Sequence, residues 1–170
     1  MKNIIFITAI LLFFSCGQDS NSNRDNKQMF ADNIEQNQII PEEIALNFVN
    51  SYVDNCNKMK GAIGILEWVE SNKMVTKSFK DELKRMIDEA DNKDPEIGLD
   101  YNPIFNAQDY PENGFEIESF DREKNFLILR GIDWPKFKLL IKISSENNTW
   151  LIDGCGSINI PNSITNQSNK

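Results

Sequence analysis

The sequence contains no histidine among its 170 residues. This absence excludes a Ser-His-Asp triad, a Cys-His pair and any zinc site that depends on imidazole ligands. Only three cysteines are present, too few for a four-thiolate metal site. The segment from Gly61 to Gly64 has neither the lysine of a P-loop nor the spacing of a dinucleotide-binding fingerprint. The sequence therefore predicts neither a metal nor a cofactor, and it carries no catalytic motif.

A second absence concerns long apolar runs. The run that follows Lys2 is too short for a bilayer crossing, which takes about 20 residues. One positive residue, a short apolar run and Ser15 are typical of a secretory signal peptide, so we expect residues 1–15 to be removed. Phe13 to Cys16 is similar to a bacterial lipobox, with phenylalanine in place of the usual leucine, and this predicts acylation of Cys16. The alternative is an ordinary cleaved signal followed by an incidental cysteine.

Residues 16–39 are rich in asparagine, glutamine, aspartate and serine, so we expect a disordered tether between a lipid anchor and the folded part. Removal of residues 1–15 takes away Lys2 alone and leaves 17 basic against 26 acidic side chains, a formal charge of −9. Such a charge repels nucleic acid and anionic lipid. We therefore expect no nucleic-acid partner, and contact with the membrane only through the anchor. The expected location is the bacterial cell envelope, on the periplasmic or surface side of the outer membrane.

Three helices are predicted in the first half of the folded part. The first opens with a proline and two glutamates, which suit a first turn, and its apolar residues recur every four positions. The third shows the same helical spacing after a serine or threonine cap. The expected ranges are Pro41–Cys56, Ala62–Glu70 and a stretch that begins at Thr76 or Ser78 and ends near Asp91.

Beyond residue 114 the apolar period changes from that of a helix to that of a strand. Turn-forming residues separate the apolar runs, and such short connections imply an antiparallel meander. The expected strands are Phe115–Glu118, Phe126–Ile132, Phe137–Ile143 and a last one that begins at Trp150 to Ile152. Helices followed by an antiparallel sheet predict one α+β domain over residues 40–160, with residues 161–170 as a flexible tail.

The segment from Asp94 to Gly114, which we call the joint, connects the predicted helices to the predicted strands. Its prolines and glycines disfavour a long helix or a central strand. Its apolar residues indicate an ordered loop packed over the core, and we expect Tyr101, Phe105 and Tyr110 to be mostly buried. The oxygen-bearing residues of the joint admit a calcium site, or turns in which they bond their own backbone. They are Asp94, Asp100, Asn102, Asn106 and Asp109.

Several segments also resemble a known family. They are Val75 to Phe79, Asp94-Pro95, Leu99-Asp100, Pro103, Asn106 to Tyr110 and the closing strand Trp150 to Asp153. Over residues 40–160 they are similar to an uncharacterised family of small bacterial lipoproteins with a cone-shaped fold of helices and sheet, similar to nuclear transport factor 2 and to cystatin. The resemblance implies that fold and a location in the cell envelope, and it brings no catalytic motif.

In a fold of that kind the usual cavity lies between the concave face of the sheet and the helices. The residues expected at its mouth are Tyr101, Asp109, Tyr110, Trp134 and Asp153. A buried carboxylate such as Asp153 would have a raised pKa and could act as a base. The alternative is structural, since an Asp-Gly pair is common in turns and aromatic residues at strand ends often belong to the core.

Two thiols remain once Cys16 is acylated. Cys56 ends the apolar stripe of the first predicted helix, and Cys155 ends the last predicted strand. If that helix packs on the sheet, the pair could reach the Cα separation of about 4.4–6.8 Å that a disulfide needs, and disulfides persist in exported proteins. The sequence leaves open a bridge between Cys56 and Cys155 or two buried free thiols.

Three classes of function stay open. The first is a non-enzymatic, lipid-anchored binding module for an envelope protein or a small ligand. The second is an immunity or inhibitor protein, whose acidic domain would plug the positively charged active site of a toxin or hydrolase. The third is a small hydrolase or isomerase that uses the cavity. Two convergent carboxylates in a pocket would favour the enzyme, whereas a filled fold with an exposed apolar patch would favour a binding module.

Overall fold

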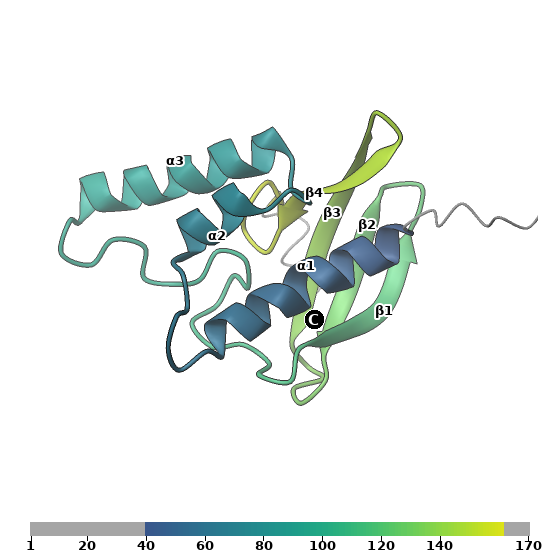
Figure 1. Ribbon diagram of the computed structural model, residues 1–170, viewed down its shortest axis with the longest axis horizontal. Helices are drawn as coiled ribbons and strands as arrows, with labels where there is room; N and C mark the ends of the chain where they lie inside the picture. The colour runs from purple at the N-terminus through teal and green to yellow at the C-terminus, as the bar shows by residue number, and fades with distance from the viewer. Residues whose placement is uncertain (1–39, 162–170) are drawn as a thin grey trace, which may run out of the picture. The chain divides into compact units, whose positions relative to one another are not determined.

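The computed structural model describes residues 40–161, which belong to one compact unit of the chain (Figure 1). The predicted signal peptide, the acylation of Cys16, the tether and the tail from residue 162 therefore lie outside the described residues. Within them, helices precede strands. The helices are α1 (Pro41–Cys56), α2 (Ile65–Ser71) and α3 (Lys77–Lys93). The strands are β1 (Phe115–Asp121), β2 (Phe126–Gly131), β3 (Lys138–Glu146) and β4 (Thr149–Cys155).

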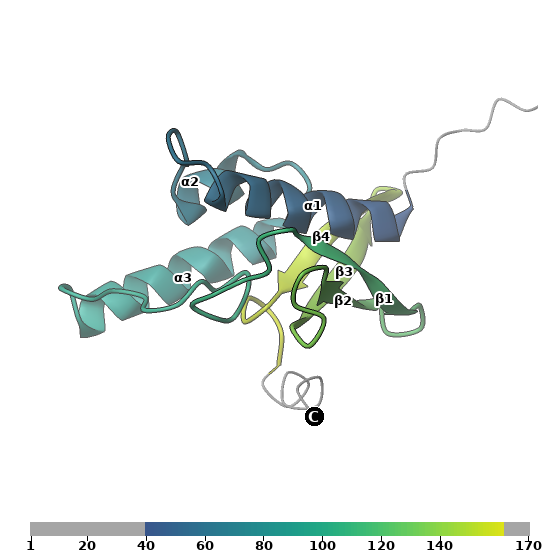
Figure 2. The same cartoon turned by 90° about the horizontal axis from the view of Figure 1, so that it is seen from below.

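The four strands of residues 40–161 form one sheet in the order β1-β2-β3-β4. Each strand pairs antiparallel with the next one along the chain. The predicted meander and the α+β class are therefore confirmed. Figures 1 and 2 show α1 crossing one face of this sheet, whereas α2 and α3 lie beyond its β4 side.

The core lies between α1 and the sheet. Helix α1 presents one apolar stripe, as its four-residue spacing predicts, and the alternating residues of the strands face it. Phe48 of α1, Leu127 and Leu129 of β2 and Ile141 of β3 are fully buried there. These side chains lie in the space between helix and sheet, where the sequence predicted a cavity.

The second helix begins at Ile65 rather than at the predicted Ala62. The reason is a contact that the local sequence does not reveal. Asn55, a buried residue of α1, donates its amide to the Ile63 carbonyl oxygen at 2.9 Å, and its own side-chain oxygen accepts the Ile63 N–H at 3.2 Å. Because both backbone groups of Ile63 bind this side chain, the segment before α2 stays extended.

Helix α3 begins where a cap was predicted. The Thr76 hydroxyl oxygen accepts the N–H of Phe79 at 3.1 Å. Just before it, the chain runs beside β4, where the Thr76 N–H donates to Ile152 and the Ile152 N–H donates to Met74. This short pairing covers the outer edge of β4 and so leaves fewer free edges on the sheet.

None of the helices within residues 40–161 combines the length and the apolar character that a membrane crossing requires.

Candidate binding pocket

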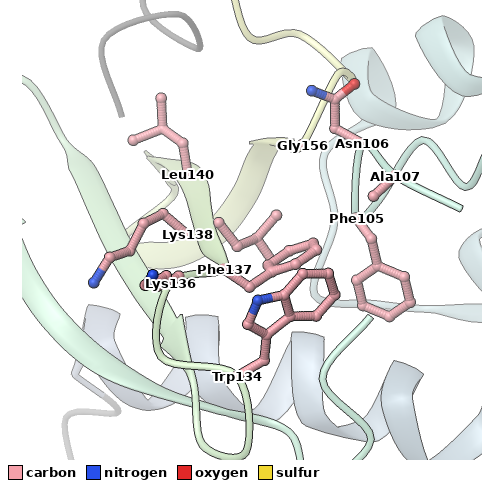
Figure 3. Close-up of a pocket in the computed structure, with 10 residues that line it drawn as sticks. Phe105, Asn106, Ala107, Trp134, Lys136, Phe137, Lys138, Leu140 and Gly156 are labelled. Atoms are coloured by element: carbon pink, nitrogen blue, oxygen red, sulfur yellow. The ribbon is translucent and has the colours of Figure 1, made fainter. Parts of the chain in front are cut away.

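A pocket of about 320 Å³ lies between the joint and the first residues of β3 (Figure 3). Phe105 to Ala107 of the joint form one wall, and Trp134 and Phe137 form the facing wall. The start of β3 and the turn after β4 complete it. The lining residues are Phe105, Asn106, Ala107, Trp134, Lys136, Phe137, Lys138, Leu139, Leu140 and Gly156. This volume is at the small end of ligand sites in proteins, so the pocket suits a small molecule or a short part of a larger one.

The turn after β4 shapes one end of the pocket. Cys155 and Ile158 exchange backbone hydrogen bonds, both at 3.0 Å, which reverses the chain. Gly156 inside this turn has a φ of 62°, a left-handed conformation that favours glycine. Its N–H still reaches the Leu140 carbonyl oxygen of β3 at 3.2 Å. The sheet pairing of β4 therefore ends beside the pocket.

The joint is fixed against this turn. The N–H and the hydroxyl of Ser157 both donate to the Pro103 carbonyl oxygen, at 3.0 and 3.2 Å. A Cβ atom on Gly156 would lie only 2.3 Å from the Ile104 carbonyl oxygen. Only glycine allows the two backbones to approach so closely, and this approach sets the position of Phe105 and its neighbours in the pocket wall.

The facing wall is an aromatic turn between β2 and β3. The Phe137 N–H donates to Trp134 at 2.9 Å, and the Gly131 N–H donates to Phe137 at 3.1 Å. The rings of Trp134 and Phe137 meet edge to face with centroids 5.2 Å apart, an arrangement that aromatic pairs prefer. Trp134 keeps 46% of its surface exposed. A large apolar side chain thus stands at the mouth of the pocket.

The charges of the lining are positive. Lys138 pairs with Glu118 of β1. Lys136 is exposed and takes part in no ion pair among residues 40–161. The lining contains no carboxylate, thiol or hydroxyl side chain. These groups offer aromatic surface and one available ammonium group, which suit the binding of an apolar ligand with a negative charge better than acid-base chemistry.

Of the five residues predicted to line a pocket, only Trp134 does so. Tyr101 donates its hydroxyl to Ser157 at 3.3 Å, outside the lining. Tyr110 stacks on Phe105, with centroids 4.7 Å apart, and its hydroxyl donates to Asn57. Asp109 is exposed on the surface of the joint. These three residues therefore lie outside the lining of this pocket.

Asp153 was expected at the mouth of a pocket, with a role as a base or a structural role left open, and its contacts are structural. One of its oxygens accepts the Thr76 hydroxyl at 2.9 Å, and the other accepts the Lys142 ammonium at 2.7 Å. It lies at an irregularity in the pairing of β3 with β4. The side chain thus connects the start of α3 to the sheet and does not line the pocket.

Sequence reasoning missed most of the lining. Phe137 and Leu139 were recognised as an alternating apolar pair, but their spacing predicts only a strand with one buried face. Lys136 and Lys138 alternate with these residues, and no binding role was predicted for them. The available signal of a pocket was Trp134, which precedes a proline in a predicted turn. A tryptophan at such a position lies outside the alternating pattern that would bury it in a strand.

The joint is ordered, as predicted, but its aromatic residues are not equally buried. Phe105 is buried with 2% of its surface exposed, whereas Tyr101 and Tyr110 are only partly buried. All three residues are therefore mostly buried, as predicted, and the hydroxyls of the two tyrosines reach polar partners near the surface.

The oxygen-rich residues of the joint form turns. Asp94 accepts the backbone N–H groups of Glu96 and Ile97, and Asn102 accepts those of Ile104 and Phe105. These bonds are the local ones that favour aspartate and asparagine in turns. Within residues 40–161, no group of acidic or cysteine side chains gathers as a metal site would require.

Cys56 and Cys155 are both free thiols, so the bridge that the sequence left open is not formed. The Cys155 sulfur is buried and donates to the Ile104 carbonyl oxygen at 3.4 Å. Cys56 is partly buried at the end of α1, near Tyr52, whose hydroxyl accepts the Asn102 amide at 2.8 Å. The joint therefore contacts Cys155 through Ile104, and it contacts Tyr52, the neighbour of Cys56, through Asn102. Burial raises the pKa of both thiols.

We expect both cysteines to be alkylated when the mature protein is denatured without reduction and treated with iodoacetamide. In the native protein Cys56 should react first, because it is less buried, and Cys155 should react only as fast as the protein unfolds. Mass spectrometry of the peptides measures both rates. A pair that is alkylated only after reduction would contradict the free thiols.

Comparisons with known proteins add no relative to this geometry: no family model, no curated protein and no solved structure matches the chain.

Proposed function

We propose that this protein is a lipid-anchored protein of the bacterial cell envelope that binds a ligand without transforming it. The observation that supports this proposal is the pocket between the joint and β3. It combines the rings of Phe105, Trp134 and Phe137 with the ammonium group of Lys136, and its lining contains no carboxylate, thiol or hydroxyl side chain. The expected ligand is apolar or aromatic and carries a negative charge.

The fold proposed for the folded part is the cone of helices and sheet found in nuclear transport factor 2 and cystatin. The order of elements supports it, since three helices precede a four-stranded meander and α1 lies across one face of the sheet. In such a fold the region between helix and sheet often holds the ligand. Here buried side chains occupy that region, and the proposed binding site lies beside the start of β3.

An aromatic anion tests the pocket directly. We expect anilinonaphthalene sulfonate to bind the mature protein with a blue-shifted, enhanced fluorescence, because its ring can lie between the aromatic walls and its sulfonate can reach Lys136. The change Trp134→Ala should lower the affinity about tenfold, which corresponds to about 1.4 kcal/mol of binding free energy. Fluorescence titration measures it.

A matched pair of charge reversals controls for the acidic character of the chain. Lys136→Glu should weaken the binding of this probe about fivefold, whereas Lys60→Glu, at an exposed lysine outside the lining, should change it little. Equal effects of the two reversals, or unchanged binding by Trp134→Ala, would show that the probe binds elsewhere and would remove the support for the pocket.

The anchor is tested by metabolic labelling with a tagged fatty acid. We expect the full-length protein to be labelled and to sediment with membranes, and we expect Cys16→Ser to lose both properties, because the acyl chains are attached to that residue. The folded part should keep its melting temperature in the variant. Equal labelling of both proteins would contradict the lipid anchor.

A further inference from the structure

The pocket lies beside a part of β3 that has no neighbouring strand on one side. β4 pairs with β3 as far as Ile141, opposite Cys155, and the last bond runs from the Gly156 N–H to the Leu140 carbonyl oxygen. The chain then turns away at Gly156. At Lys138 and Leu139, β3 therefore pairs only with β2, and on the β4 side of Leu140 the bond from Gly156 is made to the carbonyl oxygen.

The hydrogen bonds on the β2 side show which backbone groups face the pocket. In an antiparallel pair, residues alternate between directing their N–H and C=O groups toward one neighbour and toward the other. The Gly131 N–H donates to Phe137, so Phe137 and Leu139 direct their backbone groups to β2. Lys138 and Leu140 direct theirs to the side that β4 has left. Within residues 40–161, the Leu140 N–H and both backbone groups of Lys138 have no hydrogen-bond partner.

Phe105 to Ala107 of the joint lie across the pocket from this edge (Figure 3), and within residues 40–161 no backbone hydrogen bond joins them to it. An unpaired strand edge is a template for another extended chain, since such a chain can bond to it through its own backbone. The pocket thus continues the path of β4, with backbone donors and acceptors along one side and aromatic rings along another.

From this geometry we propose that the natural ligand is an extended peptide segment of an exported protein. It adds to β3 as a short antiparallel strand in the place that β4 leaves. This inference rests on the proposed function and names its ligand class. The backbone of the segment bonds to the Leu140 N–H and to both backbone groups of Lys138.

The side-chain chemistry of the pocket specifies the segment further. Successive residues of a strand point to opposite faces, so alternate side chains of the segment face different walls. One wall offers the rings of Phe105, Trp134 and Phe137 to an apolar side chain. Lys136 offers its ammonium group to a carboxylate. The carboxylate of Asp133, three residues before it, accepts the backbone N–H groups of Glu112 and Asn113. The expected segment carries an apolar residue and a single carboxylate.

Selection from a phage-displayed library of random heptapeptides tests the proposal. The target is the mature chain with Cys16→Ser, and the same chain with Trp134→Ala serves for counter-selection. We expect enriched peptides that carry β-branched or aromatic residues and one acidic residue. Their affinity, measured with synthetic peptides, should fall at least tenfold with Trp134→Ala and about fivefold with Lys136→Glu, and it should not change with Lys60→Glu.

Backbone methylation then distinguishes strand addition from any other way of binding a peptide. A peptide strand on a single edge uses the N–H of every second residue, so N-methylation should weaken binding at least tenfold at alternate positions and much less at the positions between. A loss of affinity that N-methylation causes equally at successive positions of the peptide would overturn strand addition.

The remaining outcomes separate this inference from the proposed function. If no peptide depends on Trp134 while anilinonaphthalene sulfonate still does, the pocket binds small ligands and the peptide proposal is wrong. If neither depends on Trp134, both proposals fail. If no peptide is enriched and the chain forms a dimer that Trp134→Ala abolishes in sedimentation experiments, a second copy of the chain is the occupant and the peptide proposal is overturned.

Discussion

Replacement of Gly156 by alanine should lower the free energy of unfolding by about 4 kcal/mol. A left-handed conformation costs an alanine about 1–2 kcal/mol, and Gly156 has a φ of 62°. The added Cβ would also lie 2.3 Å from the Ile104 carbonyl oxygen and 2.4 Å from that of Pro103. Relief of such a clash requires the joint to move away from the turn after β4, and overpacking of this kind costs about 1–3 kcal/mol. Urea denaturation measures the loss.

Gly61→Ala is the matched control. Gly61 also has a left-handed φ, of 80°, but no atom lies within 4 Å of the position that its Cβ would take. We expect this variant to lose only about 1 kcal/mol, the conformational part of the effect. The difference between the two variants reports the contact between the joint and the last turn. Equal losses would show that the two backbones do not approach as closely as the structure has them.

Phe105→Ala is the second change with a large expected effect, a loss of about 4 kcal/mol in the free energy of unfolding. Phe105 is buried, and its ring contacts three others, with centroids 4.7 Å from Tyr110, 5.2 Å from Tyr52 and 6.1 Å from Phe115. The ring therefore connects α1, the joint and β1. Its removal leaves a cavity among groups that rigid elements hold apart.

Tyr101→Ala serves as the comparison, because Tyr101 belongs to the same loop but is only partly buried. It should lose less than half as much as Phe105→Ala in the same urea titrations. Phe105→Leu should recover most of the stability, since it restores apolar volume. A midpoint for Phe105→Ala that equals the wild-type value would show that the joint is not part of the core.

The fold could be predicted from the sequence because its signals are local. The four-residue spacing in Pro41–Cys56, the cap at Thr76 and the change of period at Phe115 each specify an element within its own segment. The start of α2 could not be predicted, because it depends on Asn55 binding the backbone of Ile63. The Asn55 side chain binds the N–H and the C=O of Ile63 as the backbone of a neighbouring strand would, and such a contact leaves no periodic pattern in the sequence.

The pocket could not be predicted for a related reason. Its walls come from segments far apart in the chain. Phe105 and Gly156 line it, and their neighbours Ile104 and Cys155, which are 51 residues apart, are in contact. The sequence showed that the joint is apolar and ordered, but it did not show that Gly156 would let the joint approach the end of β4. It also did not show where β4 stops, and that position is what leaves part of β3 unpaired.

Residue-resolved amide hydrogen exchange of β3 tests the account most directly, because the proposed site depends on an open edge at the start of this strand. The structure predicts an alternating pattern, with slow exchange at Leu139 and Ile141, whose N–H groups face β2, and fast exchange at Lys138 and Leu140. A bound peptide should slow exchange at Lys138 and Leu140 alone. Uniform protection from Lys138 to Ile141 in the free protein would show that the edge is already paired, and it would contradict the account.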